Sequence, residues 1–324
     1  MLVYCNHVLP DPLYSMLQED GTLSWLSQFS VATPFFRMEF RADEEEMEHG
    51  QINLYFGQRT VMLVRADYRG RIQLKAAAEY QTLAPQLFGV HQPHQFPKVQ
   101  SLFREYLSEF SKKYAPVKGD TDATLTANFC RHYSARRQSE NQLAVVDSRF
   151  RLHFRHNGAH LSDEVRILAI AEIKRKLELP DPVVAPTLHD AIGILSDGSV
   201  VLVSILNKRQ TKQETLVDLL FYKLFSELLM EDGDADLNET LPSLWKQKQA
   251  LGMVHGDLKA GVNEVPFLQP VLAGMDPRED WHKLWIDECR GLLNQFAPLL
   301  DGLRLWRLHK NGQILEERVL KFNT

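Results

Sequence analysis

The spacing of apolar and polar residues predicts strands and then one long helix in the first third of the chain. Residues 51–81 have the alternation of strands, with a hairpin closed at Gly70. Residues 98–114 carry apolar side chains at three-and-four spacing, which predicts an amphipathic helix. The stretch 115–121 is rich in turn formers and reads as a linker. These patterns predict an N-terminal α+β domain over residues 1–116.

The second part of the chain alternates between the two periods. We expect a helix over 123–137 and strands over 143–154, and the apolar run 165–174 has the length of a buried strand. Two further strands, 191–195 and 200–206, are joined by an Asp-Gly pair that favours a tight turn. Helices and strands in this order predict a mixed α/β domain over residues 120–324, with a helical extension at its C-terminal end.

Two helix starts are readable towards the C-terminus. Thr211 and Glu214 form a capping box, because each side chain can bond a backbone amide of the other residue, and the helix behind it has a leucine-rich face. The pair Asp276-Pro277 predicts the start of the last helix, whose buried stripe includes Trp281 and Trp285.

The composition limits the classes of protein to which this chain can belong. The chain has 324 residues and is 44% apolar, so it can form one large or two ordinary cores. No run approaches the roughly 18 apolar residues of a membrane span. The N-terminus lacks the pattern of a secretory signal. The three cysteines are far apart, which suits a reducing compartment. We therefore expect a soluble, cytoplasmic protein with no membrane partner.

Arginines cluster in one stretch of a chain whose net charge is −5. Acidic residues gather elsewhere, at 43–48 and 231–239. A basic stripe in an acidic protein can steer a polyanion to one face, so nucleic acid is the expected partner; a solvated surface is the alternative. The arginine stripe consists of Arg131, Arg136, Arg137, Arg149, Arg151 and Arg155.

A carboxylate and an amine end the apolar run together. Strand alternation places Glu172 and Lys174 on one face, with Ile173 opposite. Asp147 ends the strand before, and Glu140 precedes that strand. Carboxylate oxygens are the ligands that Mg²⁺ and Mn²⁺ prefer, and a lysine beside the metal can orient water or offset charge. The pattern predicts a metal site at a shared strand end.

This order of elements resembles the PD-(D/E)XK nuclease superfamily over about residues 122–230. The resemblance implies a restriction-endonuclease-like mixed sheet flanked by helices, and hydrolysis of phosphodiester bonds of DNA or RNA with Mg²⁺ or Mn²⁺. It implies that Asp147 and Glu172 are metal ligands, that Lys174 is the catalytic lysine, and that Glu140 is an accessory ligand. No proline precedes Asp147, and Asp163 is an alternative first carboxylate.

Two alternatives remain. In the first, Glu172 and Lys174 are a structural ion pair in a catalytically degenerate nuclease-like module that binds nucleic acid or protein. In the second, the loop His255-Gly-Asp257-Leu-Lys259 is similar to the catalytic loop of protein kinases and aminoglycoside phosphotransferases, in which the aspartate accepts the substrate's proton. The cofactor separates the three: a nuclease needs a divalent metal, a kinase needs ATP, and a binding module needs neither.

Overall fold

A computed structural model describes most of the chain as a mixed α/β protein. The described residues are 2–4, 7–32, 36–42, 50–57, 59–114, 121–134, 143–150, 153–156, 159–160, 189–206, 211–217, 219–220, 237–254 and 269–322. The chain divides into two compact units. The N-terminal unit comprises Asn6–Gln138 and Ser243–Gly256, and the C-terminal unit comprises Met1–Cys5, Ser139–Pro242 and Asp257–Thr324.

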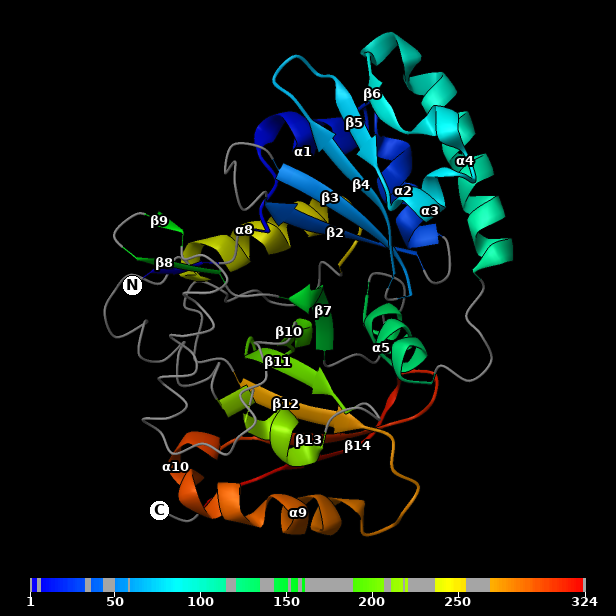
Figure 1. Cartoon of the computed structure of the whole chain (residues 1–324). Helices are drawn as coiled ribbons and strands as arrows, with labels where there is room; N and C mark the ends of the chain where they lie inside the picture. The colour runs from blue at the N-terminus through cyan, green and yellow to red at the C-terminus, as the bar shows by residue number, and fades with distance from the viewer. Residues whose placement is uncertain are drawn as a thin grey trace. The chain divides into compact units, whose positions relative to one another are not determined.

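An antiparallel sheet, here called the N-terminal sheet, forms the N-terminal unit's framework. Its described strands follow the order β2-β3-β4-β5-β6 (Figure 1). Every neighbouring pair is antiparallel, so consecutive strands are neighbours in space. The strands are β2 (Phe36–Ala42), β3 (Gly50–Phe56), β4 (Arg59–Ala66), β5 (Ile72–Lys75) and β6 (Gly89–His91).

Aromatic side chains make the core of the N-terminal unit. Helix α4 (Phe96–Lys113) buries Phe103, Tyr106 and Phe110, and the Tyr106 hydroxyl donates a 2.7 Å hydrogen bond to the Val61 carbonyl. Phe103 also contacts the aromatic rings of α2. The hydrogen bond fixes α4 to β4. The remaining helices are α1 (Asp11–Leu17), α2 (Ser24–Ala32), α3 (Ala78–Gln81) and α5 (Thr121–His132), with 3-10 turns at Pro85–Leu87 and Pro93–Gln95.

Residues late in the chain return to the N-terminal unit through α8 (Leu237–Ala250). The Gln247 side chain accepts from the Leu9 amide and donates to the Leu9 carbonyl, both at 2.8 Å. The next residue is Lys248, whose Nζ lies 2.5 Å from Glu39 Oε2 of β2. These contacts hold the end of α8 against the N-terminal segment and the N-terminal sheet.

A mixed sheet, here called the C-terminal sheet, is the framework of the C-terminal unit. Its described strands follow the order β14-β13-β12-β11-β10-β7 (Figure 1). β10 is antiparallel to both β7 and β11, whereas β12 is parallel to both β11 and β13. β14 closes an antiparallel hairpin with β13. The strands are β7 (Leu143–Phe150), β10 (His189–Leu195), β11 (Val200–Ile205), β12 (Gln269–Gly274), β13 (Arg304–Leu308) and β14 (Ile314–Val319).

Helices supply the parallel connections of the C-terminal sheet. Helical residues 212–217 and 219–220 lie between β11 and β12 in the chain, and α9 (Trp281–Gln295) and α10 (Ala297–Leu300) lie between β12 and β13. A Cβ atom on Gly274 of β12 would stand 3.1 Å from the Trp285 ring. Because only glycine leaves that space, α9 can pack directly on the strand.

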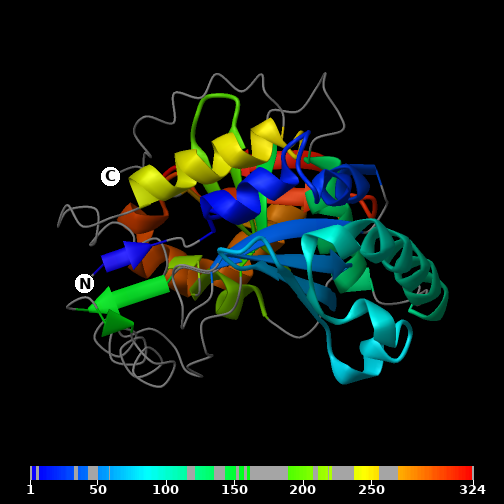
Figure 2. The same ribbon diagram turned by 90° about the horizontal axis from the view of Figure 1, so that it is seen from above.

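A small sheet completes the C-terminal unit. β1 (Leu2–Tyr4) pairs antiparallel with β8 (His153–His156), and the two run side by side in Figure 2. β8 also pairs with β9 (Ala159–His160). Among the helices that the structure describes, none has the length and hydropathy needed to cross a membrane.

Most of the predicted elements within the described ranges are confirmed. α4 occupies the predicted helix, and Gly70 closes the β4–β5 hairpin with a φ of 71°. Two predictions are wrong in detail. Residues 78–81 form α3 instead of extending a strand, and the last helix begins at Trp281 rather than at Asp276. The apolar run 165–174 lies outside the described residues.

Candidate functional site

Asp147 is the described member of the predicted metal site. It lies on β7 and is 1% exposed. Its Oδ1 accepts a 2.7 Å hydrogen bond from the Ser148 amide. A buried carboxylate is costly unless hydrogen bonds or a cation compensate the charge, so its buried position calls for partners.

A second aspartate, Asp190, lies beside it on β10. The register pairs Ile192 with Asp147 and Ala191 with Ser148. Since side chains alternate along a strand, Asp190 and Asp147 share one face and are diagonal neighbours. Diagonal neighbours are about 7–8 Å apart, and their Cβ atoms are somewhat closer than that. Two carboxylates at that spacing can reach one divalent ion at about 2.0–2.6 Å per oxygen.

The neighbouring strand extends this polar row. The register of β10 and β11 pairs Ala191 with Val203, which puts Ser204 opposite Asp190. Ser204 is 6% exposed, and Asp190 Oδ2 accepts a 2.7 Å hydrogen bond from the next amide, that of Ile205. Asp147, Asp190 and Ser204 therefore form a row across β7, β10 and β11, on a single face of the C-terminal sheet.

Of the residues of the predicted metal site, Asp147 is the one within the described ranges. Glu140, Glu172 and Lys174 lie outside the described residues. Sequence reasoning missed Asp190. The sequence signal for Asp190 was a carboxylate at the start of an otherwise apolar strand, His189–Leu195. An Asp-Gly turn joins that strand to the next one.

The arginine stripe is divided between the two units. Arg131 is exposed in the last turn of α5 and belongs to the N-terminal unit. Arg149 is on β7 and Arg155 is on β8, both in the C-terminal unit. The register of β7 and β10 pairs His189 with Phe150 and Ala191 with Ser148, so Arg149 takes the position opposite Asp190. The stripe residues that lie outside the described ranges are Arg136, Arg137 and Arg151.

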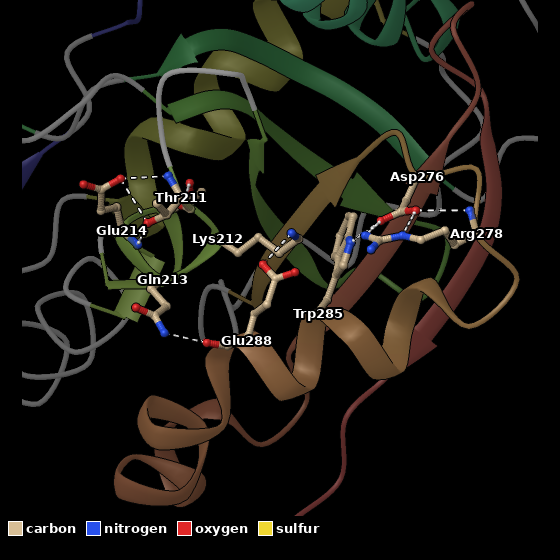
Figure 3. Close-up of polar contacts among 9 residues, drawn as sticks. Thr211, Lys212, Gln213, Glu214, Asp276, Arg278, Trp285 and Glu288 are labelled. Carbon is tan, nitrogen blue, oxygen red and sulfur yellow. Dashed lines mark hydrogen bonds and ion pairs between the residues drawn. The ribbon is translucent and has the colours of Figure 1, made fainter.

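The kinase-like loop also falls outside the described residues, with His255, Asp257 and Lys259. Asp276, the expected cap of the last helix, has another role. Its carboxylate accepts hydrogen bonds from Arg278 Nε at 2.8 Å and Nη2 at 2.5 Å, and from Trp285 Nε1 at 3.0 Å (Figure 3). Hydrogen bonds from Arg278 hold the pKa of Asp276 well below its usual range. The carboxylate thus anchors the segment before α9.

The helix that follows β11 is fixed at its start. Thr211 and Glu214 form the predicted capping box, with the Thr211 amide donating to Glu214 Oε2 at 2.7 Å. Lys212 Nζ lies 2.6 Å from Glu288 Oε2, and the Gln213 side chain donates to the Glu288 carbonyl at 2.5 Å (Figure 3). These contacts join the helix to α9, so both helices are held on the same side of the C-terminal sheet.

Neither a family model nor a curated protein nor a solved structure matches this chain. Within the described residues, no group of three or more histidine, cysteine, aspartate or glutamate side chains could hold a metal ion. The pair formed by Asp147 and Asp190 is below that size.

Proposed function

We propose that the C-terminal unit is a metal-dependent nuclease related to the PD-(D/E)XK superfamily, with Asp147 and Asp190 as the described metal ligands. The observation that carries this proposal is their diagonal placement on one face of β7 and β10. An antiparallel β7-β10-β11 series followed by a helix and a parallel β12 is also consistent with a restriction-endonuclease-like mixed sheet.

The donor set fits Mg²⁺ or Mn²⁺, because both prefer carboxylate oxygens. Bound there, the ion would lower the pKa of a water molecule and polarise a phosphodiester. The amides of Ser148 and Ile205 hold one oxygen of each aspartate in place by hydrogen bonds of 2.7 Å. Glu172 remains the proposed third carboxylate and Lys174 the proposed group that orients water.

A second candidate is the catalytically degenerate module, and one observation favours it. Ser204, rather than an acidic residue, takes the register position facing Asp190 on β11. A neutral hydroxyl is a weaker ligand for a hard cation than a carboxylate. In this alternative the row is structural, and the protein binds nucleic acid or a protein without cleaving it.

Cleavage of labelled DNA and RNA, single- and double-stranded, separates the two candidates. We expect hydrolysis with Mg²⁺ or Mn²⁺, none with chelator, and a fall of about a hundredfold or more for Asp190→Asn, since metal stabilisation of the transition state is worth several kcal/mol. Asp197→Asn is the matched control, because Asp197 lies in the β10–β11 turn at the other end of the hairpin. Metal-independent cleavage, or equal activity of Asp190→Asn, contradicts the nuclease proposal.

A variant with an added carboxylate tests the alternative that the module is catalytically degenerate. Ser204→Asp places a third carboxylate opposite Asp190. If the row is a metal site, the variant is less stable than wild type in chelator and is restored by Mn²⁺, because the ion offsets the added buried charge. If the row is structural, Mn²⁺ leaves the melting temperature of Ser204→Asp unchanged.

A further inference from the structure

The outer edge of β14 has the composition of a pairing surface. β14 is the last strand in the order of the C-terminal sheet, and no described strand pairs with its outer side. Leu315 is 54% exposed and Val319 is 42% exposed, both among the most exposed large apolar residues described. An edge strand offers a row of backbone donors and acceptors to another strand, and exposed apolar residues favour such pairing.

Backbone geometry shows which residues of β14 point outward. The Leu320 amide donates to the Leu303 carbonyl, and the Leu320 carbonyl accepts from the Gly302 amide, so the backbone of Leu320 is directed towards β13. Amides and carbonyls alternate in direction along an antiparallel strand. Glu317 and Val319 therefore direct theirs outward. A register shift between Arg307 and Leu308 of β13 leaves Leu315 opposite no residue in the described pairing.

We propose that β14 pairs with β14 of a second copy of this chain, antiparallel about a two-fold axis at Glu317. A closed dimer uses the same surface on both copies, so residue i of one strand meets residue j of the other and the reverse. With the axis at Glu317, Glu316 faces Arg318 of the partner subunit, and Leu315 faces the partner subunit's Val319. The outward backbone groups of Glu317 and Val319 then lie at hydrogen-bonded positions.

Charge selects this register. Within one chain, Arg318 Nη2 already lies 2.6 Å from Glu316 Oε1. In the dimer each Arg318 also faces Glu316 of the partner subunit at the closer, non-hydrogen-bonded positions of the ladder, so the two in-chain pairs join into one cluster of four alternating charges. An axis one residue later would place Arg318 directly opposite its own copy, which is repulsive. At the axis, each Glu317 carboxylate is already compensated within its chain by Arg304 Nη1 at 2.6 Å and by Trp306 Nε1 at 2.9 Å. The two glutamates can therefore approach each other.

Disulfide trapping of variants that each add one cysteine to the chain tests both pairing and register. In Glu317→Cys the two Cα atoms lie about 5.5 Å apart, within the range that a disulfide spans. In the matched variant Leu315→Cys the two cysteines are offset by four residues, about 13 Å along the strands, which is too far. Cys130 and Cys289 are buried, and the parent protein measures the background.

We expect oxidation to convert Glu317→Cys into covalent dimer and to leave Leu315→Cys at the parent's level. Equal yields in both variants, or no dimer above background in Glu317→Cys while its melting temperature shows an intact fold, overturn the proposal.

Charge variants give a second readout by analytical ultracentrifugation. Arg318→Glu should raise the dimer dissociation constant about tenfold or more, since two attractive pairs become repulsive, whereas Arg318→Lys should change it little. Wild type sedimenting as a 37.3 kDa monomer at every concentration also overturns it.

Discussion

The buried ion pair of the N-terminal unit predicts an unusually large effect of one lysine on stability. Lys248 and Glu39 are separated by 2.5 Å, and their side chains are only 2% and 7% exposed. Lys112 and Glu109 are separated by 2.6 Å, but their side chains are 69% and 53% exposed. The two pairs join the same chemical groups at nearly the same distance, and the large difference in burial should dominate their difference in stability.

Removal of the lysine should therefore have different costs at the two places. Lys248→Met leaves the Glu39 carboxylate in a buried position, and the expected loss in free energy of unfolding is about 3–5 kcal/mol. Lys112→Met leaves a carboxylate that water solvates, and the expected loss is about 0–1 kcal/mol. Urea denaturation followed by circular dichroism measures both.

A double variant makes the test sharper. Replacing both buried charges, in Lys248→Met with Glu39→Leu, should recover a large part of the loss, because no carboxylate is left to desolvate. The reasoning is refuted if Lys248→Met costs no more than Lys112→Met, or if adding Glu39→Leu deepens the loss. Either result would mean that the pair is solvated in solution.

Three further predictions test other parts of the molecule. Hydrogen bonds from Arg278 lower the pKa of Asp276. The stability that this carboxylate contributes is therefore present above the unfolded carboxyl pKa of about 3.9 and is lost as the pH falls towards the lowered value. In urea titrations, Asp276→Asn should flatten the dependence of the free energy of unfolding on pH between about pH 5 and pH 3. A Cβ atom on Gly193 would stand 2.7 Å from one side chain and 3.0 Å from a backbone oxygen, so Gly193→Ala should cost about 1–3 kcal/mol by calorimetry. Gly291→Ala in α9 meets nothing within 4 Å and should instead stabilise by about 0.5–1 kcal/mol, and the opposite order would contradict the packing. Reversal of charge at Arg136 and Arg137 should weaken nucleic-acid binding about equally for all sequences and reduce the salt dependence of the affinity. Unchanged affinity would show that the arginine stripe does not bind phosphates.

Local chemistry explains what could be read from the sequence. The spacing of apolar residues predicts the position of α4, and the Asp-Gly pair predicts the β10–β11 turn, in which the Gly198 amide donates a hydrogen bond to the Leu195 carbonyl. The capping box of Thr211 was equally local. Each of these signals is carried by residues a few positions apart.

Contacts between distant residues escaped the same reasoning. Lys248 and Glu39 are 209 residues apart, and no local pattern links them. Asp276 has the pattern of a helix cap because a proline follows it, but its carboxylate accepts a hydrogen bond from Trp285, nine residues further along the chain, as well as a local one from Arg278. Asp190 became a candidate ligand only when the register set it beside Asp147, since strand order cannot be derived from one strand's pattern.

Direct measurement of metal binding tests the central claim that Asp147 and Asp190 together hold a divalent ion. Calorimetric titration of the full chain with Mn²⁺ should give one site per chain. Asp147→Asn and Asp190→Asn should each weaken that site about tenfold or more, because loss of one of two carboxylates removes a charged ligand. Asp197→Asn should bind as wild type does. Wild type without saturable binding, or with binding that both site variants retain in full, would contradict the account.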